Sequence, residues 1–130
     1  FQNPDGKVII LKNQYSESKD VSFIETFSIN KFDSNKIAVG DINSDDLPDI
    51  VLHGSNFFGP NSTFAFINNS TANLVEFIEE DLGISSYYTE HFDLVDFDQD
   101  GDLDINILGV KDASYYAYQV LVYENTFSPL

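Results

Sequence analysis

The chain has 130 residues, of which 42% are hydrophobic and 15% aromatic, and 22 acidic residues against six basic ones give it a formal net charge of −16. This length and apolar content support one folded domain and exclude a disordered acidic tail. The scarcity of basic residues argues against nucleic acid and anionic membrane surfaces as partners, and no apolar run approaches the roughly 20 residues of a membrane-spanning helix.

Short segments rich in β-branched and aromatic residues follow one another along the chain, separated by turn-forming residues, and predict strands. The predicted strands, in chain order, cover residues 8–12, 22–28, 37–41, 49–54, 62–68, 74–80, 91–96, 104–109 and 116–124. Helix signals are weak, and only residues 79–83 suggest a single helical turn. The sequence therefore predicts an all-β fold with regularly spaced short strands.

Three sequence markers recur at nearly one spacing, which indicates an internal repeat. The acidic stretches at 40–54 and 95–109 align, so that Asp41 and Asp96 lie 55 positions apart. Apolar segments that end in asparagine recur every 56 positions, at Asn13, Asn69 and Asn125. A Phe-Ile-Glu motif also recurs, after 54 positions. The chain therefore holds about two and a half copies of one unit of about 55 residues.

Both acidic stretches carry oxygen ligands at the spacing of a divalent-cation loop. Counted from its first aspartate, the second stretch has acids at positions 1, 3, 5 and 9 and glycine at position 6: Asp96, Asp98, Asp100, Asp104 and Gly101. The first stretch has, at positions 1, 3, 5, 6 and 9, Asp41, Asn43, Asp45, Asp46 and Asp49. Hard divalent cations bind six to eight oxygens, and alternating carboxylates on a turning loop converge on one point.

The backbone carbonyl at position 7, from Leu47 or Asp102, would complete each ligand set, and position 6 must turn with a positive φ, which aspartate tolerates better than most residues. Calcium fits this pattern best, because magnesium needs a stricter octahedron and retains more water. An EF-hand is excluded, because its glutamate at position 12 is replaced by Leu52 or Ile107 and both flanks are strand-like. Two copies in register argue against a merely solvated acidic face or isolated Asx turns.

The pattern DxDxDGxxD between two short strands, repeated after 55 positions and followed by a strand that ends near asparagine, resembles the FG-GAP/VCBS repeats. The segments LPDIVL and GDLDI match that signature, and the spacing covers essentially the whole chain. Such repeats form the blades of integrin-like β-propellers, in which the loop joins the first two strands of a blade and binds calcium. The resemblance implies two Ca²⁺ sites. Asn43 and Asp46 depart from the family pattern at positions 3 and 6, which concerns affinity more than binding.

The resemblance also implies a division of the single repeat domain, residues 1–130, into β-propeller-type blades. Residues 1–36 would form a partial blade of outer strands, 37–90 a full blade with the first calcium loop, and 91–130 a partial blade with the second. Propellers close with about four to eight blades, so we expect either a part of a larger propeller or completion by other copies of the chain. The cut ends of such an array would expose apolar surface.

A calcium ion held wholly by protein ligands stabilises structure rather than performing catalysis. Extracellular modules bind calcium with a Kd of about 10⁻⁴ to 10⁻³ M, which cytosolic calcium would not saturate. We therefore expect a non-enzymatic, extracellular module of a secreted or cell-surface protein, used for adhesion or for recognition of a protein or glycan ligand. Two alternatives stay open: a subunit that assembles with copies of itself into a filament, and the propeller portion of a polysaccharide-active enzyme.

Other residues carry less specific signals. Asn61, Asn68 and Asn69 lie in N-glycosylation sequons. His53 and His91 lie in no recognised catalytic spacing and are expected to have structural or surface roles. The aromatic-rich loops at 54–63 and 109–118 are candidates for a ligand-binding face.

Overall fold

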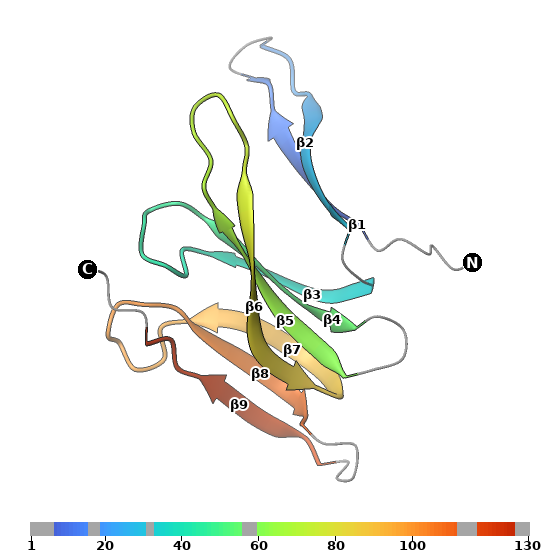
Figure 1. The fold of residues 1–130 in the computed structure, drawn as a ribbon, viewed down its shortest axis with the longest axis vertical. Coiled ribbons are helices and arrows are strands. Elements are labelled where there is room, and N and C mark those ends of the chain that lie inside the picture. The colour runs from blue at the N-terminus through green and yellow to red at the C-terminus, as the bar shows by residue number, and fades with distance from the viewer. Residues whose placement is uncertain (1–6, 16–18, 31–32, 56–59, 112–116, 127–130) are drawn as a thin grey trace.

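The computed structural model describes residues 7–15, 19–30, 33–55, 60–111 and 117–126. Within these residues the chain forms three small antiparallel sheets (Figure 1). The two-stranded sheet contains β1 (Lys7–Asn13) and β2 (Phe23–Asn30). The four-stranded sheet contains β3 (Asp33–Gly40), β4 (Asp49–Ser55), β5 (Asn61–Asn68) and β6 (Phe77–Ser86), in that order. The three-stranded sheet contains β7 (Tyr88–Val95), β8 (Asp104–Val110) and β9 (Gln119–Tyr123).

The all-β prediction is confirmed, and each predicted strand overlaps an observed one. The single helical turn predicted at residues 79–83 is wrong, because these residues lie inside β6. Gly83 has a φ of 66°, and the pairing with β5 shifts register between Ser62 and Phe64. The local signal for a turn therefore marks a β-bulge, in which a residue with a left-handed backbone is accommodated without ending the strand.

The four-stranded sheet lies between the other two sheets. Apolar residues on one of its faces form a core with β1 and β2: Ile29, Ile50, Leu52 and Phe66, with Val8, Ile10, Phe27, Phe64 and Phe77 packed around them. Residues on its other face form a second core with the three-stranded sheet: Val51, Ala65, Phe92, Ile105 and Ile107, with eight partly buried neighbours that include Leu94 and Leu121. Successive residues of β4 thus serve opposite cores, which explains why its sequence is apolar without alternation.

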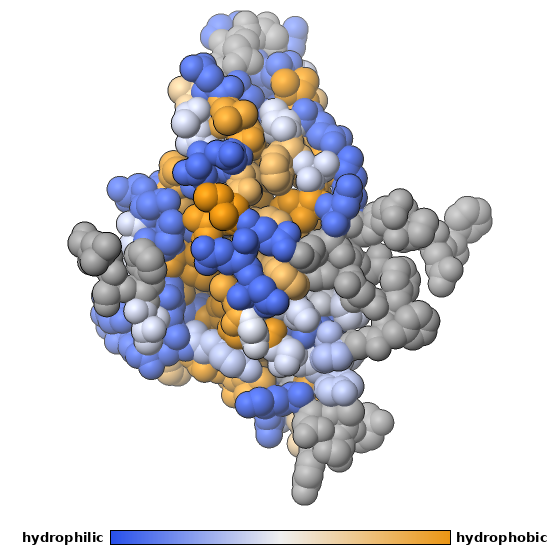
Figure 2. All heavy atoms as spheres, in the orientation of Figure 1, coloured by the Kyte–Doolittle hydropathy of each residue, from blue (hydrophilic) through white to orange (hydrophobic). Residues whose placement is uncertain are grey.

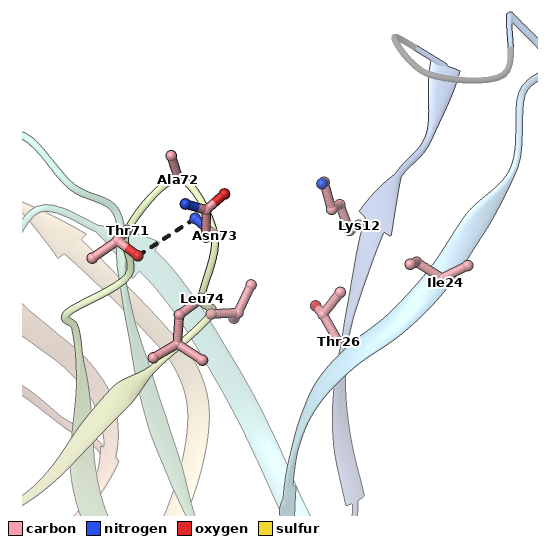
Figure 3. Close-up of a pocket in the computed structure, with 8 residues that line it drawn as sticks. Lys12, Ile24, Thr26, Thr71, Ala72, Asn73 and Leu74 are labelled. Atoms are coloured by element: carbon pink, nitrogen blue, oxygen red, sulfur yellow. Dashed lines mark hydrogen bonds between the residues drawn. The ribbon is translucent and has the colours of Figure 1, made fainter.

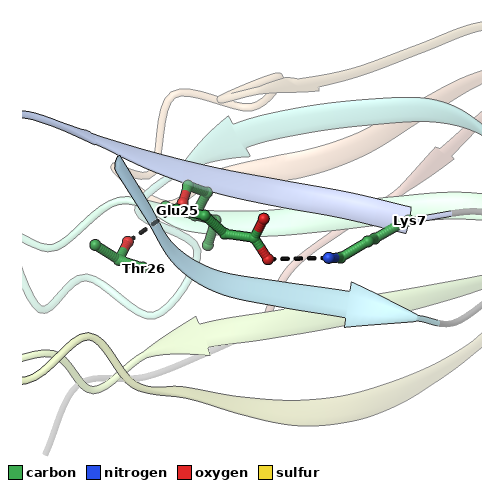
Figure 4. A network of polar contacts seen from close by, with 4 residues as sticks. Lys7, Glu25 and Thr26 are labelled. Atoms are coloured by element: carbon green, nitrogen blue, oxygen red, sulfur yellow. Dashed lines mark hydrogen bonds and ion pairs between the residues drawn. The ribbon is translucent and has the colours of Figure 1, made fainter. Parts of the chain in front are cut away.

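The β1–β2 hairpin contacts the four-stranded sheet through its apolar face, and polar contacts join its two strands to each other. Its ion pair, between Lys7 Nζ and Glu25 Oε1 at 2.9 Å, joins side chains that are 36% and 47% exposed (Figure 4). Such exposed pairs contribute little, about 0–1 kcal/mol. Thr26 donates its hydroxyl to the Ile10 carbonyl at 3.2 Å, which joins the two strands to each other.

Both outer sheets present apolar side chains on the face opposite their core. On β1, Ile9 and Leu11 are 45% and 54% exposed, whereas Val8 and Ile10, which alternate with them, pack inward. On β9, Val120 and Val122 are likewise exposed. Figure 2 shows one face of the molecule, on which hydrophobic residues reach the surface among hydrophilic ones. These outward apolar faces resemble surfaces that a neighbouring layer would cover.

His53 on β4 joins the four-stranded sheet to β7 through a buried hydrogen-bond network. The ring is fully buried, its Nδ1 lies 2.8 Å from Thr63 Oγ1, and its Nε2 lies 2.9 and 2.8 Å from the hydroxyls of Ser86 and Thr89. The ring also stacks on Phe92, with centroids 5.3 Å apart.

The network selects one tautomer of the neutral ring. Thr63 donates its only hydroxyl proton to the Ile84 carbonyl at 3.0 Å, so towards His53 it can only accept. His53 Nδ1 therefore carries the proton, and Nε2 accepts one from Ser86 or Thr89. No carboxylate contacts the ring from β5, β6 or β7 in this network, and burial lowers the pKa of His53 to about 4.

This lowered pKa makes the fold sensitive to acid. The unfolded chain protonates His53 near pH 6.5 and the folded chain only near pH 4, so stability is lost as the pH falls through this window. Between pH 7.5 and 5 the loss from this group is about 2 kcal/mol.

We predict that His53→Gln removes this part of the pH dependence. Denaturant unfolding at both pH values would measure it, with His91→Gln on the exposed face of β7 as the matched control. NMR titration of the His53 ring gives a second readout that needs no variant. A ring that titrates near pH 6.5 in the folded chain would contradict the prediction.

Candidate metal centres

The second acidic loop, residues 96–104, brings three carboxylates together. Oxygens of Asp96, Asp98 and Asp100 all lie within 4.8 Å of one another. The Asp96 carboxylate accepts backbone N–H bonds from Asp100 at 3.1 Å and Gly101 at 3.2 Å, so the loop winds around its first residue. Asp98 and Asp100 are exposed and contribute an all-oxygen donor set.

The first acidic loop, residues 41–49, repeats this geometry. The Asp41 carboxylate accepts backbone N–H bonds from Asp45 at 3.0 Å and Asp46 at 2.7 Å, at the same two positions as in the second loop. Asn43 donates its amide to Asp45 Oδ2 at 2.9 Å. Its oxygen, Oδ1, is buried without a hydrogen-bond partner. The asparagine thus leaves an oxygen available for a ligand at position 3.

In both loops the backbone turns through residues with a positive φ at positions 4 and 6. Position 6 has a φ of 69° at Asp46 and 102° at Gly101, as the sequence pattern predicts. Position 4 is also left-handed, with a φ of 59° at Ser44 and 64° at Gln99. Sequence reasoning missed position 4, because neither residue is one that favours this conformation.

The aspartates at position 9 are buried and tie each loop to the end of a strand. Asp49 is 0% exposed, and its two oxygens accept N–H bonds from Ile42 at 2.9 Å and Asn68 at 2.7 Å. Asp104 is 1% exposed and accepts the equivalent bonds from Phe97 at 2.9 Å and Asn125 at 2.8 Å. Each carboxylate therefore joins the start of its loop to an asparagine near the end of the third strand of its sheet. These asparagines are Asn68 at the end of β5 and Asn125 just after β9.

Asn68 and Asn125 are equivalent residues, which corrects the alignment of Asn69 with Asn125. The side-chain amide of Asn68 donates to the Pro48 carbonyl at 2.9 Å, and that of Asn125 donates to the equivalent Leu103 carbonyl at 3.3 Å. Two adjacent asparagines made the sequence alignment ambiguous by one residue. The strand register resolves it, because only Asn68 reaches the buried carboxylate.

Asp102, at position 7, adds a further charge to the second loop. Its side chain is 8% exposed, and its Oδ1 is buried without a hydrogen-bond partner. Burial, together with the negative charges of Asp100, Asp104 and Asp98, raises the pKa of Asp102 to about 6. A positive ion would relieve this repulsion. The oxygen-only donors and the unpartnered oxygens of Asn43 and Asp102 fit a hard divalent cation such as Ca²⁺.

The three sequon asparagines differ in accessibility. Asn61 is 6% exposed, and Asn68 uses its amide within the loop network described above. Asn69 is exposed, and its amide donates to Glu76 Oε2 at 2.9 Å. Of the three, Asn69 therefore offers the most accessible side chain. Residues 56–59 and 112–116, in the two aromatic-rich candidate loops, lie outside the described residues.

A separate open cavity of about 520 Å³ lies between the β1–β2 hairpin and residues 71–75 (Figure 3). Its lining mixes polar and apolar groups: Lys12, Ile24, Thr26, Thr71, Ala72, Asn73, Leu74 and Val75. Asn73 donates its backbone N–H to Thr71 Oγ1 at 3.4 Å, which closes the turn on one side. The cavity includes none of the acidic-loop residues.

Comparison with known proteins places the chain in no family: no family model, no curated protein and no solved structure matches it. Among the described residues, no helix is long and apolar enough to cross a membrane.

We predict that Asp49→Asn or Asp104→Asn destabilises the fold even without metal. The amide nitrogen would face a backbone N–H, so one charge-assisted bond is lost in a buried position, at a cost of about 2–3 kcal/mol. Denaturant unfolding in excess chelator would measure the loss. Asp81→Asn is the matched control, because exposed Asp81 accepts a single N–H bond, from Gly83 at 2.9 Å. An equal loss in the control would refute a special role for the buried pair.

Proposed function

We propose that the chain is a non-enzymatic, calcium-binding module of β-propeller-type blades in a secreted or cell-surface protein. The observation that carries the calcium assignment is the duplication of one loop geometry. Both loops wrap around their first aspartate, turn at positions 4 and 6, and bury the aspartate of position 9 against a strand end. An acidic surface that is merely solvated would not be expected to show the same hydrogen-bond network twice, 55 residues apart.

The proposed ligands are oxygens at positions 1, 3, 5 and 7 of each loop. In the first loop they are Asp41, Asn43, Asp45 and the Leu47 carbonyl, and in the second Asp96, Asp98, Asp100 and the Asp102 carbonyl. Asp49 and Asp104 complete the sets, since a carboxylate oxygen that accepts one N–H bond keeps a further lone pair. Bound calcium would neutralise part of the charge of −16 and fasten each loop across two strands.

The sheets support the blade assignment by their equivalent parts. The three-stranded sheet repeats the first three strands of the four-stranded sheet, with the acidic loop between its first two strands in both cases. In β1–β2, the Asn13 side chain accepts the N–H of Tyr15 at 2.9 Å, as Asn68 accepts that of Ser70 at 3.0 Å. This shared turn supports assigning β1 and β2 as the third and fourth strands of a unit, equivalent to β5 and β6.

Adhesion, or recognition of a protein or glycan, is the role that we propose for such a module, because sites of this kind stabilise a surface rather than react. A filament-forming subunit is the second candidate. It is favoured by the outward apolar faces, on which Ile9, Leu11 and Val120 are exposed. Stacking of one copy's outer face on another's would cover both faces.

Calcium at millimolar concentration should raise the melting temperature by about 10 °C relative to excess chelator. Mass action at ten- to twenty-fold saturation gives about 1.5 kcal/mol per site, or about 3 kcal/mol for two. The double variant Asp98→Asn/Asp100→Asn should lose at least half of this rise, because it removes one of the two sites. Glu79→Gln/Glu80→Gln, which changes the net charge equally on β6, should keep it.

Circular dichroism and light scattering in the same melts separate the two candidates. Particles that grow with protein concentration would favour the filament, and a calcium-stabilised monomer would favour the recognition module. No calcium effect on the wild-type chain would overturn the metal assignment.

A further inference from the structure

Asn125 contacts both acidic loops at once. Its side-chain nitrogen donates to the Ile42 carbonyl of the first loop at 2.8 Å and to the Leu103 carbonyl of the second loop at 3.3 Å. Its backbone N–H donates to Asp104 of the second loop. Ile42 directly follows Asp41, the first proposed ligand of its loop. Both loops and the end of β9 lie on the same side of the molecule (Figure 1).

A packing contact joins the same two loops independently of this hydrogen bond. Gly40, the last residue of β3, directly precedes Asp41. A Cβ atom on Gly40 would lie 2.6 Å from Leu103 Cδ1 and 3.2 Å from Leu94 Cδ1, so the Leu103 side chain occupies the space that a larger residue would need. Leu103 of the second loop and Asn125, which is bonded to that loop, therefore contact the residues on both sides of Asp41.

We infer that the two acidic loops are coupled through Asn125 and Leu103, so that a divalent cation in one loop increases the affinity of the other. This inference rests on the proposed calcium binding. A cation in the second loop orders residues 96–104, and this order holds Leu103 and Asn125 against Gly40 and Ile42. The first loop then loses less conformational entropy when it binds, which is positive coupling. By thermodynamic reciprocity the effect is equal in the other direction.

The contact through Asn125 points back along the repeat. Asn68 contacts its own loop at Pro48 in the way that Asn125 contacts Leu103. The bond from Asn125 to Ile42 reaches back to the unit before its own. Each such asparagine would therefore join its own loop to the preceding one, and coupling would pass between neighbouring units, as expected for a repeat array.

Calcium titration calorimetry on the full chain tests the coupling. Asp98→Asn/Asp100→Asn disables the second loop and reports the affinity of the first loop alone. We expect this affinity to be at least about five-fold weaker than that of the same loop in the wild-type chain. In an Asn125→Ala background, disabling the second loop should weaken the first loop's affinity by a smaller factor, because only the Leu103 contact then joins the two loops. Asn68→Ala is the matched control, which removes the bond to Pro48 and leaves the response to the second loop intact.

Hydrogen exchange provides a readout that does not depend on the Asn125 variant folding. In Asp41→Asn/Asp45→Asn the first loop is disabled, and calcium in the second loop should still slow exchange of the Ile42 amide, whose acceptor Asp49 is unchanged. Independent affinities in the wild-type chain, or equal effects of Asn68→Ala and Asn125→Ala, would overturn the coupling while calcium binding stands. No binding heat in any variant would overturn the proposed function itself.

Discussion

A buried carboxylate at the end of each acidic loop holds the loop to the sheet. Asp49 and Asp104 are almost inaccessible, and each satisfies both oxygens with backbone N–H groups from two different segments. A charge in the interior is tolerated only when it is fully hydrogen-bonded, so these bonds constrain both segments. The start of the loop, the start of the next strand and the end of the third strand are thereby brought to one point.

The remaining loop acids depend on this anchor. With the position-9 carboxylate in place, the first aspartate accepts two loop N–H groups, and Asp45, Asp98 and Asp100 stay exposed. In the second loop, burial and the negative charges of Asp100, Asp104 and Asp98 together raise the pKa of Asp102. Holding these carboxylates close together raises the electrostatic free energy of the loop. A cation bound among their oxygens would make that electrostatic free energy favourable.

The anchored loops also connect the stacked sheets. β4 is buried on both faces, so the four-stranded sheet cannot satisfy its apolar residues without a neighbour on each side. Two polar contacts also join the four-stranded and three-stranded sheets. His53 on β4 bonds to Thr89 on β7, and Asn125, after β9, bonds to Ile42 in the first acidic loop. One set of contacts, around His53, responds to acid, and the other, around Asn125, lies between the proposed cation sites. We therefore expect the two sets to respond to different solution conditions although they join the same layers.

The sequence by itself determined the all-β class, the repeat and the positions of the acidic loops, because these depend on local composition and on spacing along the chain. It also indicated the positive φ at Asp46, where one residue's backbone preference decides. Pairing register was decided only in the tertiary structure: Asn68 rather than Asn69 matches Asn125, since the buried carboxylate selects one of two adjacent asparagines. The bulge at Gly83, the tautomer of His53 and the bond from Asn125 to Ile42 likewise depend on partners 10 to 83 residues away. Contacts at such separations follow from how the layers pack, and no local pattern encodes them.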